Sequence, residues 1–438
     1  MDTQKINIFW FRRDLRLEDN HGLYQALNDE PPVLPIFIFD TEILKLLKQD
    51  DRRVPMIHQM ILKLKESIEK YGSSLKVLYG NPKEEIEKLS QQYSIKSIHT
   101  NTDYEPVAKE RDDSIANWCL SRQIDFVSWK DQVIFEKSEV VKPDSNPYTV
   151  YTPYSKKWKA HWNQQPQQPY NSEKLLHRLI STPPFKVPSL DEMGFIAETP
   201  TVTAFNINDK WLNDYADNRD IPSLAHTSML SVHLRFGTIG IRTIVNKVLK
   251  HEKFLNELIW REFFMQILWH FPKVEKRNFN PKYDTIQWRN SEQELQRWMK
   301  GQTGIPIVDA GMRELNETGY MHNRVRMITA SYLCKNLLID WRWGEAYFAE
   351  KLLDCDLASN NGNWQWAAGT GCDAAPYFRI FNPESQTQKF DPNYEYIRKW
   401  VPEFESSTYK KPMIDQKSAR IRTLAAYKKA IEEYNNSH

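Results

Sequence analysis

The fold of the first third of the chain is decided by the apolar stretch Ile-Asn-Ile-Phe-Trp-Phe at residues 6–11. Four more short apolar runs follow, with the sequences VLPIFIF at 33–39, SLKVLYG at 74–80, IKSIHT at 95–100 and IDFVSW at 124–129. Segments with helical spacing separate them, as in Met56, Met60, Leu64 and Ile68. This alternation is typical of a parallel sheet with crossover helices. We therefore predict a doubly wound, five-stranded α/β domain over residues 1–130.

Two further segments follow this domain. Residues 131–203 are rich in Pro, Gln, Ser and Lys and have little periodicity, so we predict a long linker that wraps the surface. From residue 204 onward strand signals disappear, and helical patterns cover 238–250, 251–270, 291–300, 307–318, 322–339 and 343–353. We therefore predict an all-helical domain over residues 204–438.

The composition is that of a soluble globular protein. Of the 438 residues, 40% are hydrophobic and 26% are charged, and no apolar run approaches the roughly 18 residues of a membrane span. The N-terminal sequence lacks the long apolar core of a secretory signal, and the four cysteines are scattered, so we expect a cytoplasmic protein with reduced thiols. Because 59 basic residues nearly balance 57 acidic ones, a nucleic-acid site must be a local patch.

Several common ligand motifs are missing from the sequence. It has no GxGxxG after the first apolar run, no GxxxxGK[ST], no HExxH and no metal-spaced Cys/His set. The α/β domain is therefore not expected to bind a dinucleotide in the usual way, and no metal site is expected. Ten of the fifteen tryptophans follow residue 200, which indicates a need for aromatic rings in the helical half.

Three segments of the helical half have the side chains of a binding site. In the first, Glu257, Trp260 and Arg261 share one helix face, where they suit hydrogen bonding to a base edge, stacking and a phosphate contact. A core tryptophan beside a surface ion pair is the alternative interpretation. In the other two, Arg324 and Arg326 point to different sides of a helix, and Asp354 is placed to meet Arg326. Taken alone, the second segment is explained by ordinary surface arginines and the third by a capped loop between two helices. These explanations do not account for three such segments in one helical domain.

With these segments in view, the whole chain resembles the cryptochrome/photolyase family, most closely its microbial class I cyclobutane pyrimidine dimer photolyases. The resemblance runs nearly from end to end. Its longest motifs are FRRDLRLEDN at 11–20, TSMLSVHLRFG at 227–237, GYMHNRVRMITASYL at 319–333 and NWQWAAGTGCDAAPYFRIFNP at 363–383.

The resemblance implies that the helical domain holds FAD and binds DNA. It places an Arg326–Asp354 pair over the isoalloxazine ring, with Asp356 nearby and Asn360 beside the flavin N5 atom. An amide at that position tolerates a reduced, anionic flavin and favours repair over signalling. Contacts to the flavin phosphates and ribityl chain are implied for Tyr215, Thr227, Ser228 and Ser231.

The resemblance also implies light-dependent repair of a dimer that is flipped out of the DNA stack. Glu257 hydrogen-bonds the dimer and stabilises its radical anion, Trp260 and Trp366 stack on it, and Met327 lies against its edge. The excited, reduced flavin donates one electron, the cyclobutane ring opens, and the electron returns. Contacts to the lesion or its phosphates are implied for Arg219, Arg261, Asn323, Arg324 and Gln386.

Two further roles follow from the resemblance. Trp364, Trp341 and Trp288 match the tryptophan chain that carries electrons from the surface to oxidised FAD, with core packing as the alternative. A second, light-harvesting antenna chromophore is possible. The Asn-Glu pair of folate-binding members is replaced here by Val107-Ala108, so a deazaflavin, another flavin or no antenna stays open.

Three other functions compete with dimer repair. A (6-4) photolyase is expected to have histidines in place of Asn323 and Met327. A cryptochrome photoreceptor typically adds a C-terminal extension, whereas few residues follow Val401. A light-independent flavin carrier leaves Glu257 and Trp260 without a role. We therefore expect a monomeric, carbon–carbon-bond-cleaving lyase whose partner is DNA containing pyrimidine dimers.

Overall fold

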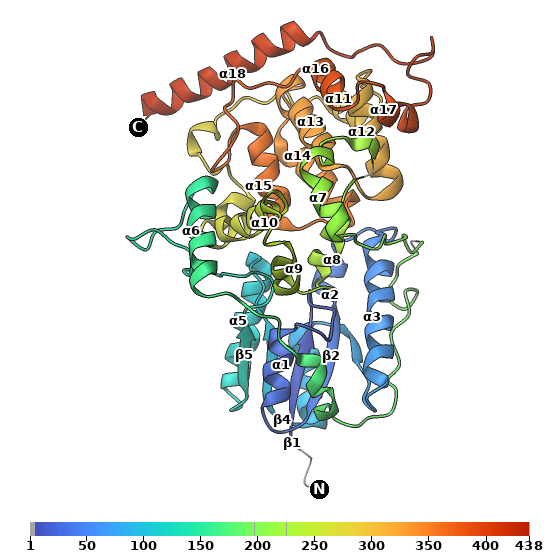
Figure 1. Ribbon diagram of the computed structural model, residues 1–438, viewed down its shortest axis with the longest axis vertical. Helices are drawn as coiled ribbons and strands as arrows, with labels where there is room; N and C mark the ends of the chain where they lie inside the picture. Colours follow the sequence, from blue (N-terminus) through green and yellow to red (C-terminus); the bar gives the residue numbers. More distant parts are fainter. Residues whose placement is uncertain (1–4, 197, 225, 438) are drawn as a thin grey trace. The chain divides into compact units, whose positions relative to one another are not determined.

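The computed structural model describes residues 5–196, 198–224 and 226–437, which form two compact units (Figure 1). The first, here called the α/β unit, comprises Met1–Val140, Trp158–Phe205 and Met229–Leu255. The second, the helical unit, comprises Val141–Lys157, Asn206–Ser228 and Asn256–His438.

A five-stranded parallel sheet forms the centre of the α/β unit, and its strand order is β3-β2-β1-β4-β5. The strands are β1 (Lys5–Phe11), β2 (Val33–Asp40), β3 (Lys76–Gly80), β4 (Ser94–Asn101) and β5 (Asp125–Trp129). β1 is central, pairing Phe9 with Pro35 on one side and with His99 on the other. Since both faces of such a strand are covered, it is a continuous apolar run in the sequence. The predicted doubly wound fold is confirmed.

Helices connect the strands of this unit. They are α1 (His21–Asn28), α2 (Thr41–Leu44), α3 (Arg53–Glu69), α4 (Pro82–Gln92) and α5 (Pro106–Leu120), followed later in the chain by α8 (Leu230–Phe236) and α9 (Ile241–Val248). α4 begins at Pro82, because the Asn81 side chain accepts a hydrogen bond from the Lys83 N–H and Pro82 occupies the first turn.

The helical unit is built from helices around one large apolar core. They are α7 (Asp209–Asn218), α11 (Glu292–Met299), α12 (Pro306–Thr318), α13 (Asn323–Ser331), α14 (Trp341–Lys351), α15 (Leu357–Ala368), α16 (Pro383–Phe390), α17 (Glu395–Trp400) and α18 (Gln416–Ser437). Trp298, Leu333, Trp341 and Trp364 belong to its core. α10 (Glu252–His270) and α6 (Tyr151–Gln164) contain residues of both units.

Two local expectations differ from the structure. The pattern at 322–339 predicts one helix, but α13 ends at Ser331 and a π-helical segment, Tyr332–Asn336, follows. The segment expected to be a surface linker contains α6, in which Tyr154, Trp158 and Trp162 are buried. These rings recur every four residues and form one helix face, a pattern that the Lys- and Gln-rich composition conceals. Among the described residues, no helix is both long and apolar enough to cross a bilayer.

Candidate active site

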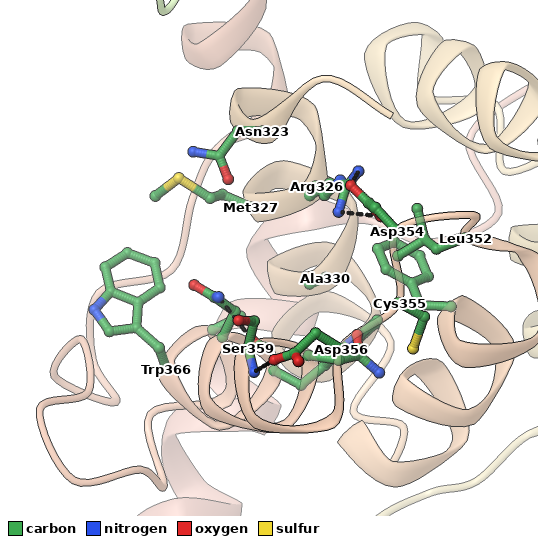
Figure 2. Close-up of a pocket in the computed structure, with 15 residues that line it drawn as sticks. Asn323, Arg326, Met327, Ala330, Leu352, Asp354, Cys355, Asp356, Ser359 and Trp366 are labelled. Carbon is green, nitrogen blue, oxygen red and sulfur yellow. Dashed lines mark hydrogen bonds and ion pairs between the residues drawn. The ribbon is translucent and has the colours of Figure 1, made fainter. Parts of the chain in front are cut away.

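A pocket in the helical unit gathers many of the residues singled out in the sequence (Figure 2). Its cavity volume is about 100 Å³, and its walls come mainly from α13, α15 and the segment between α14 and α15. The predicted site residues among its lining are Asn323, Arg326, Met327, Asp354, Asp356, Asn360, Trp364 and Trp366. Side chains from sequence positions about 40 apart therefore meet at one cavity.

An ion pair forms one wall of this pocket. The Arg326 Nη2 atom lies 2.9 Å from the Asp354 Oδ2 atom, and Arg326 Nε donates to the Met321 carbonyl at 2.7 Å. The side chain of Asp354 is only 4% exposed. Burial opposes the charge of Arg326, but the nearby Asp354 carboxylate raises the guanidinium pKa above its usual value. The pairing of these two residues that the sequence predicts is confirmed, and it gives the pocket a fixed, oriented charge pair (Figure 2).

Asp356 and Asn360 are held at the beginning of α15. Asp356 is its N-cap and accepts a hydrogen bond from the Ser359 N–H at 3.0 Å. Asn360 Nδ2 donates to the Glu345 carbonyl at 3.1 Å, which fixes the orientation of the amide. The Glu345 carboxylate accepts from Asn361 Nδ2 at 3.1 Å, and burial raises its pKa to about 7. Sequence reasoning missed Glu345, whose only signal was its place in the aromatic-rich stretch WRWGEAYF at 341–348.

Tyr320 connects Thr227 to this pocket. A hydrogen bond joins the side chains of Thr227 and Tyr320, and the Arg326 guanidinium lies 5.4 Å from the centre of the Tyr320 ring. Ser228, next in the chain, accepts a hydrogen bond from the Asn206 N–H through its carbonyl at 2.9 Å. Ser231 lies on α8 in the α/β unit, where it is exposed.

The helix face of α10 that the sequence singles out meets the end of α7. Glu257 is ion-paired with Arg219, the C-cap residue of α7, whose guanidinium also lies 5.3 Å from the centre of the Tyr215 ring. Arg261 is half-buried on the same helix. Trp260 is half-buried as well, and Tyr151 from the first turn of α6 stacks on it. The Glu257 carboxylate on α10 therefore has a cationic partner, Arg219, at the end of α7.

Arg324 lies on the side of α13 opposite to the Arg326 pair. Its Nη2 atom is 2.8 Å from Asp220 Oδ1, and its guanidinium covers the Phe390 ring at 4.3 Å. Phe390 ends α16, the helix that carries the half-buried Gln386. Two arginines two positions apart thus face different surroundings, as the sequence predicts.

The three tryptophans assigned to electron transfer belong to the core of the helical unit. Trp364 lines the pocket and is 2% exposed, while Trp341 is fully buried and donates from Nε1 to Asn278 Oδ1 at 2.9 Å. Trp288 is half-buried and packs against the same core. Trp364 therefore lies at the pocket, Trp341 lies inside the core and Trp288 is partly exposed, an arrangement that suits an electron path from the pocket to the surface. The redox role itself stays a prediction. Trp298 lies edge-on to Trp364, with ring centroids 6.2 Å apart.

The α/β unit has a larger cavity of its own, with a volume of about 670 Å³. It lies where β1 and β4 are neighbours and the strand order reverses, the usual ligand position in doubly wound sheets. Arg12 and Arg111 lie 5.0 and 4.9 Å from the centre of the Trp10 ring, which lines the cavity. Val107 and Ala108 also belong to its wall.

Comparison with known proteins gives two family matches. Residues 7–171 match the family described as DNA photolyase, and residues 254–408 match the FAD-binding domain of DNA photolyase. The deoxyribodipyrimidine photo-lyase of Halobacterium salinarum is 36% identical, covering 91% of this chain and 89% of that protein. The protein of the same name from Escherichia coli is 34% identical, with 97% and 98% covered.

Solved structures agree with these matches. A bacterial class III photolyase from Agrobacterium tumefaciens has a TM-score of 0.87 at 32% identity, covering 99% of this chain and 98% of that one. An archaeal photolyase from Sulfolobus tokodaii with two FAD molecules has a TM-score of 0.84 at 33% identity, with 97% and 100% covered. A cryptochrome from Synechocystis is similar in fold, with a TM-score of 0.86 at 24% identity and the same shares covered.

Proposed function

Since the chain belongs to the DNA photolyase family, we propose that it repairs cyclobutane pyrimidine dimers in DNA by light-driven electron transfer from reduced FAD to a flipped-out dimer. One observation carries the proposal. A single pocket joins the Arg326–Asp354 pair and Asn360, which suit a flavin, to Met327 and Trp366, which suit a base. The reaction class is that of a carbon–carbon lyase, because a cyclobutane ring is opened.

The side chains of the pocket fit a flavin ring. Such a ring presents carbonyl oxygens and ring nitrogens at its edge, and Arg326 supplies N–H donors there while Asp354 supplies acceptors. Asp356 and Asn360 complete this set, and Thr227 approaches it through Tyr320. When bound and excited by light, FAD supplies the electron. Three hydroxyl residues of the helical unit are proposed to hold its phosphates and ribityl chain: Tyr215, Thr227 and Ser228. The contact expected for Ser231, which belongs to the other unit, stays a prediction.

The protein's own part in repair is to hold the dimer and its charge. Met327 and Trp366 give the pocket an apolar and aromatic wall, onto which an unstacked pyrimidine packs favourably. Glu257 is proposed to hydrogen-bond the dimer, with the ion pair to Arg219 orienting its carboxylate. Trp260 is proposed as the second stacking surface. A dimer pairs poorly with the opposite strand, so its extrusion costs less than that of an intact pair.

Contacts with the DNA backbone are proposed for the charged and polar side chains around the pocket. Arg324 already lies beside Asp220, so a phosphate has to compete with that half-buried carboxylate for the guanidinium. Arginine suits this exchange because its planar fork binds a phosphate with two parallel hydrogen bonds. The full proposed set is Arg219, Arg261, Asn323, Arg324 and Gln386.

Reactivation of oxidised FAD is proposed to use Trp364, Trp341 and Trp288. Trp364 lies at the pocket and Trp288 reaches solvent, so an electron lost by the flavin is replaced from outside the protein. The fully buried Trp341 is the middle member.

A second chromophore is proposed for the cavity of the α/β unit. Its volume of about 670 Å³ admits a planar ring system, and its wall combines apolar side chains with arginines that are paired to acidic residues, as Arg12 is to Asp112. The S. tokodaii photolyase, described as holding two FAD molecules, supports a flavin-type antenna over a folate. Val107 and Ala108 in the cavity wall supply no polar contacts for a folate through their side chains.

The remaining proposals concern the state and location of the protein. We propose that it acts as a monomer, because one chain contains both the flavin-type pocket and the stacking side chains. We also propose that it works in the cytoplasm of a microbial cell, where chromosomal DNA is its substrate. Sedimentation of the purified protein with and without a dimer-containing duplex tests the first of these statements.

The deciding experiment is repair of an oligonucleotide with one thymine cyclobutane dimer by the purified, reduced protein under blue light. A dark control and a (6-4) lesion are run beside it, and the bound chromophores are identified from the absorption of the denatured protein. Restoration of the cyclobutane substrate alone, and only in light, is expected. A bound, photoreducible flavin without repair of either lesion would refute repair and favour a photoreceptor.

A further inference from the structure

We infer that Tyr151 is a positioning residue of the lesion site, where it holds the Trp260 indole in place for stacking on the flipped-out dimer. The inference rests on the proposed function, which assigns that stacking to Trp260. Tyr151 falls within residues 131–203, whose composition predicts a linker, and the sequence predicts no role for it. Both residues belong to the helical unit.

The contact between the two rings is unusually close and flat. Their centroids are 3.7 Å apart and their planes differ by 4°, so the phenol covers one face of the indole in van der Waals contact. Phe263 meets Trp260 edge-on at 5.6 Å and 82°, and Phe264 approaches it at 5.4 Å. Trp260 nevertheless stays half-buried, so part of the ring is accessible. Protein rings thus restrain the indole before any substrate arrives.

Tyr151 is itself fixed at two points. Its hydroxyl donates to the Asn256 carbonyl at 2.9 Å, one turn before Trp260 on α10. Its backbone N–H donates to Asp373 Oδ2 at 3.0 Å. Asp373 follows α15, the helix that carries Trp366 near its end. Tyr151 therefore connects the helix that bears Glu257 and Trp260 to the segment that follows Trp366.

This arrangement matters because stacking on a mobile ring is weaker than stacking on a fixed one. A tryptophan free to change rotamer loses conformational entropy when it stacks on a base, and that loss lowers affinity. An indole already pressed against Tyr151 has largely lost this freedom in the free protein. The contribution is specific to a flipped-out lesion, because undamaged DNA keeps its bases in the duplex. Tyr151 should therefore affect lesion preference more than general DNA affinity.

The test compares Tyr151→Leu with Tyr151→Phe in the FAD-containing protein. For each, dissociation constants are measured for a dimer-containing oligonucleotide and for its undamaged counterpart, together with the repair yield at saturating substrate. Tyr151→Leu should reduce the lesion preference by about tenfold, as expected for a weakened base–aromatic stack. Tyr151→Phe keeps the ring and the N–H to Asp373, so it should stay within about threefold of the wild type. Flavin content and photoreduction should be unchanged in both.

A double-mutant cycle with Trp260→Leu distinguishes action through Trp260 from a general structural effect. If Tyr151 acts by holding that ring, Tyr151→Leu should change lesion preference little once the indole is gone. An undiminished effect in the Trp260→Leu background, or a normal lesion preference in Tyr151→Leu alone, would overturn the inference. Should Tyr151→Leu lose its flavin, Tyr151→Met takes its place in the cycle. A wild-type protein that neither prefers nor repairs dimers would instead refute the proposed function.

Discussion

Replacing His322 with Asn should make the protein less sensitive to acid. His322 is the N-cap of α13, where its Nδ1 atom accepts a hydrogen bond from the Arg324 N–H at 3.1 Å, and it is 3% exposed. Burial, together with the nearby Arg326 and Arg324 charges, lowers its pKa from 6.5 to about 4, although Asp220 acts in the opposite direction. Asn is itself a preferred N-cap residue, so the variant keeps the cap and removes the titrating group.

The magnitude follows from the two pKa values. Because the unfolded imidazole binds a proton near pH 6.5 and the folded one only near pH 4, the unfolded state gains protons first as the pH falls. The stability contributed by the neutral histidine is therefore complete above about pH 6.5 and is lost progressively toward pH 4. At pH 5 the loss amounts to about 2 kcal/mol of the free energy of unfolding.

Urea unfolding at pH 8 and pH 5, followed by tryptophan fluorescence, measures this effect. The quantity compared is the change in the free energy of unfolding between the two pH values, because it cancels any constant packing cost of the substitution. The wild type should lose about 2 kcal/mol more than His322→Asn between these pH values. An equal loss in both proteins would show that burial does not shift the pKa of His322 in the folded state.

Three further substitutions test other parts of the site. Trp341→Phe should abolish photoreduction of oxidised FAD, measured by absorption, and leave repair by chemically reduced protein intact; normal photoreduction would remove Trp341 from the electron path. Arg324→Ala should weaken lesion binding and lower the slope of log affinity against log salt by about one, whereas an unaltered slope would place Arg324 away from the phosphates. Glu345→Gln should gain stability relative to the wild type as the pH rises from 4 to 8, because the raised pKa of Glu345 makes its ionisation more costly in the folded state. The expected gain is about 3 kcal/mol in urea unfolding, and parallel pH curves would contradict it.

The fold could be predicted largely from local patterns. β1 and β2 are buried on both faces, so their sequences are continuous apolar runs whatever their partners. The strand order is not a local property, but the alternation with helices restricts it to few arrangements. The π-helical segment Tyr332–Asn336 was missed because its apolar spacing resembles that of an α-helix over so short a length. The predicted domain boundaries at 130 and 203 stay a prediction.

Site contacts between residues in recognisable motifs were predictable from the sequence, whereas contacts with residues outside those motifs were not. The pairing of Arg326 with Asp354 was predictable because both lie in motifs and only opposite charges satisfy each other when buried. The partner of Glu257 was not, since Arg219 is 38 positions away at the end of another helix and no periodicity connects them. Resemblance to a family predicts which residues contact a ligand, but it does not predict the neighbouring residues that fix the positions of those side chains.

Tyr151 and Glu345 are residues of this second kind, and they act on opposite sides of the reaction. Glu345 fixes the neighbourhood of Asn360 through one backbone and one side-chain hydrogen bond, which orients the amide that is proposed to lie beside the flavin ring. Tyr151 fixes the ring on which the dimer is proposed to stack. Electron transfer depends on the geometry of both partners, so rigidity is needed on each side. Substitution of Glu345 is therefore expected to act on the flavin and substitution of Tyr151 on lesion binding, even though neither residue is proposed to touch the cyclobutane ring.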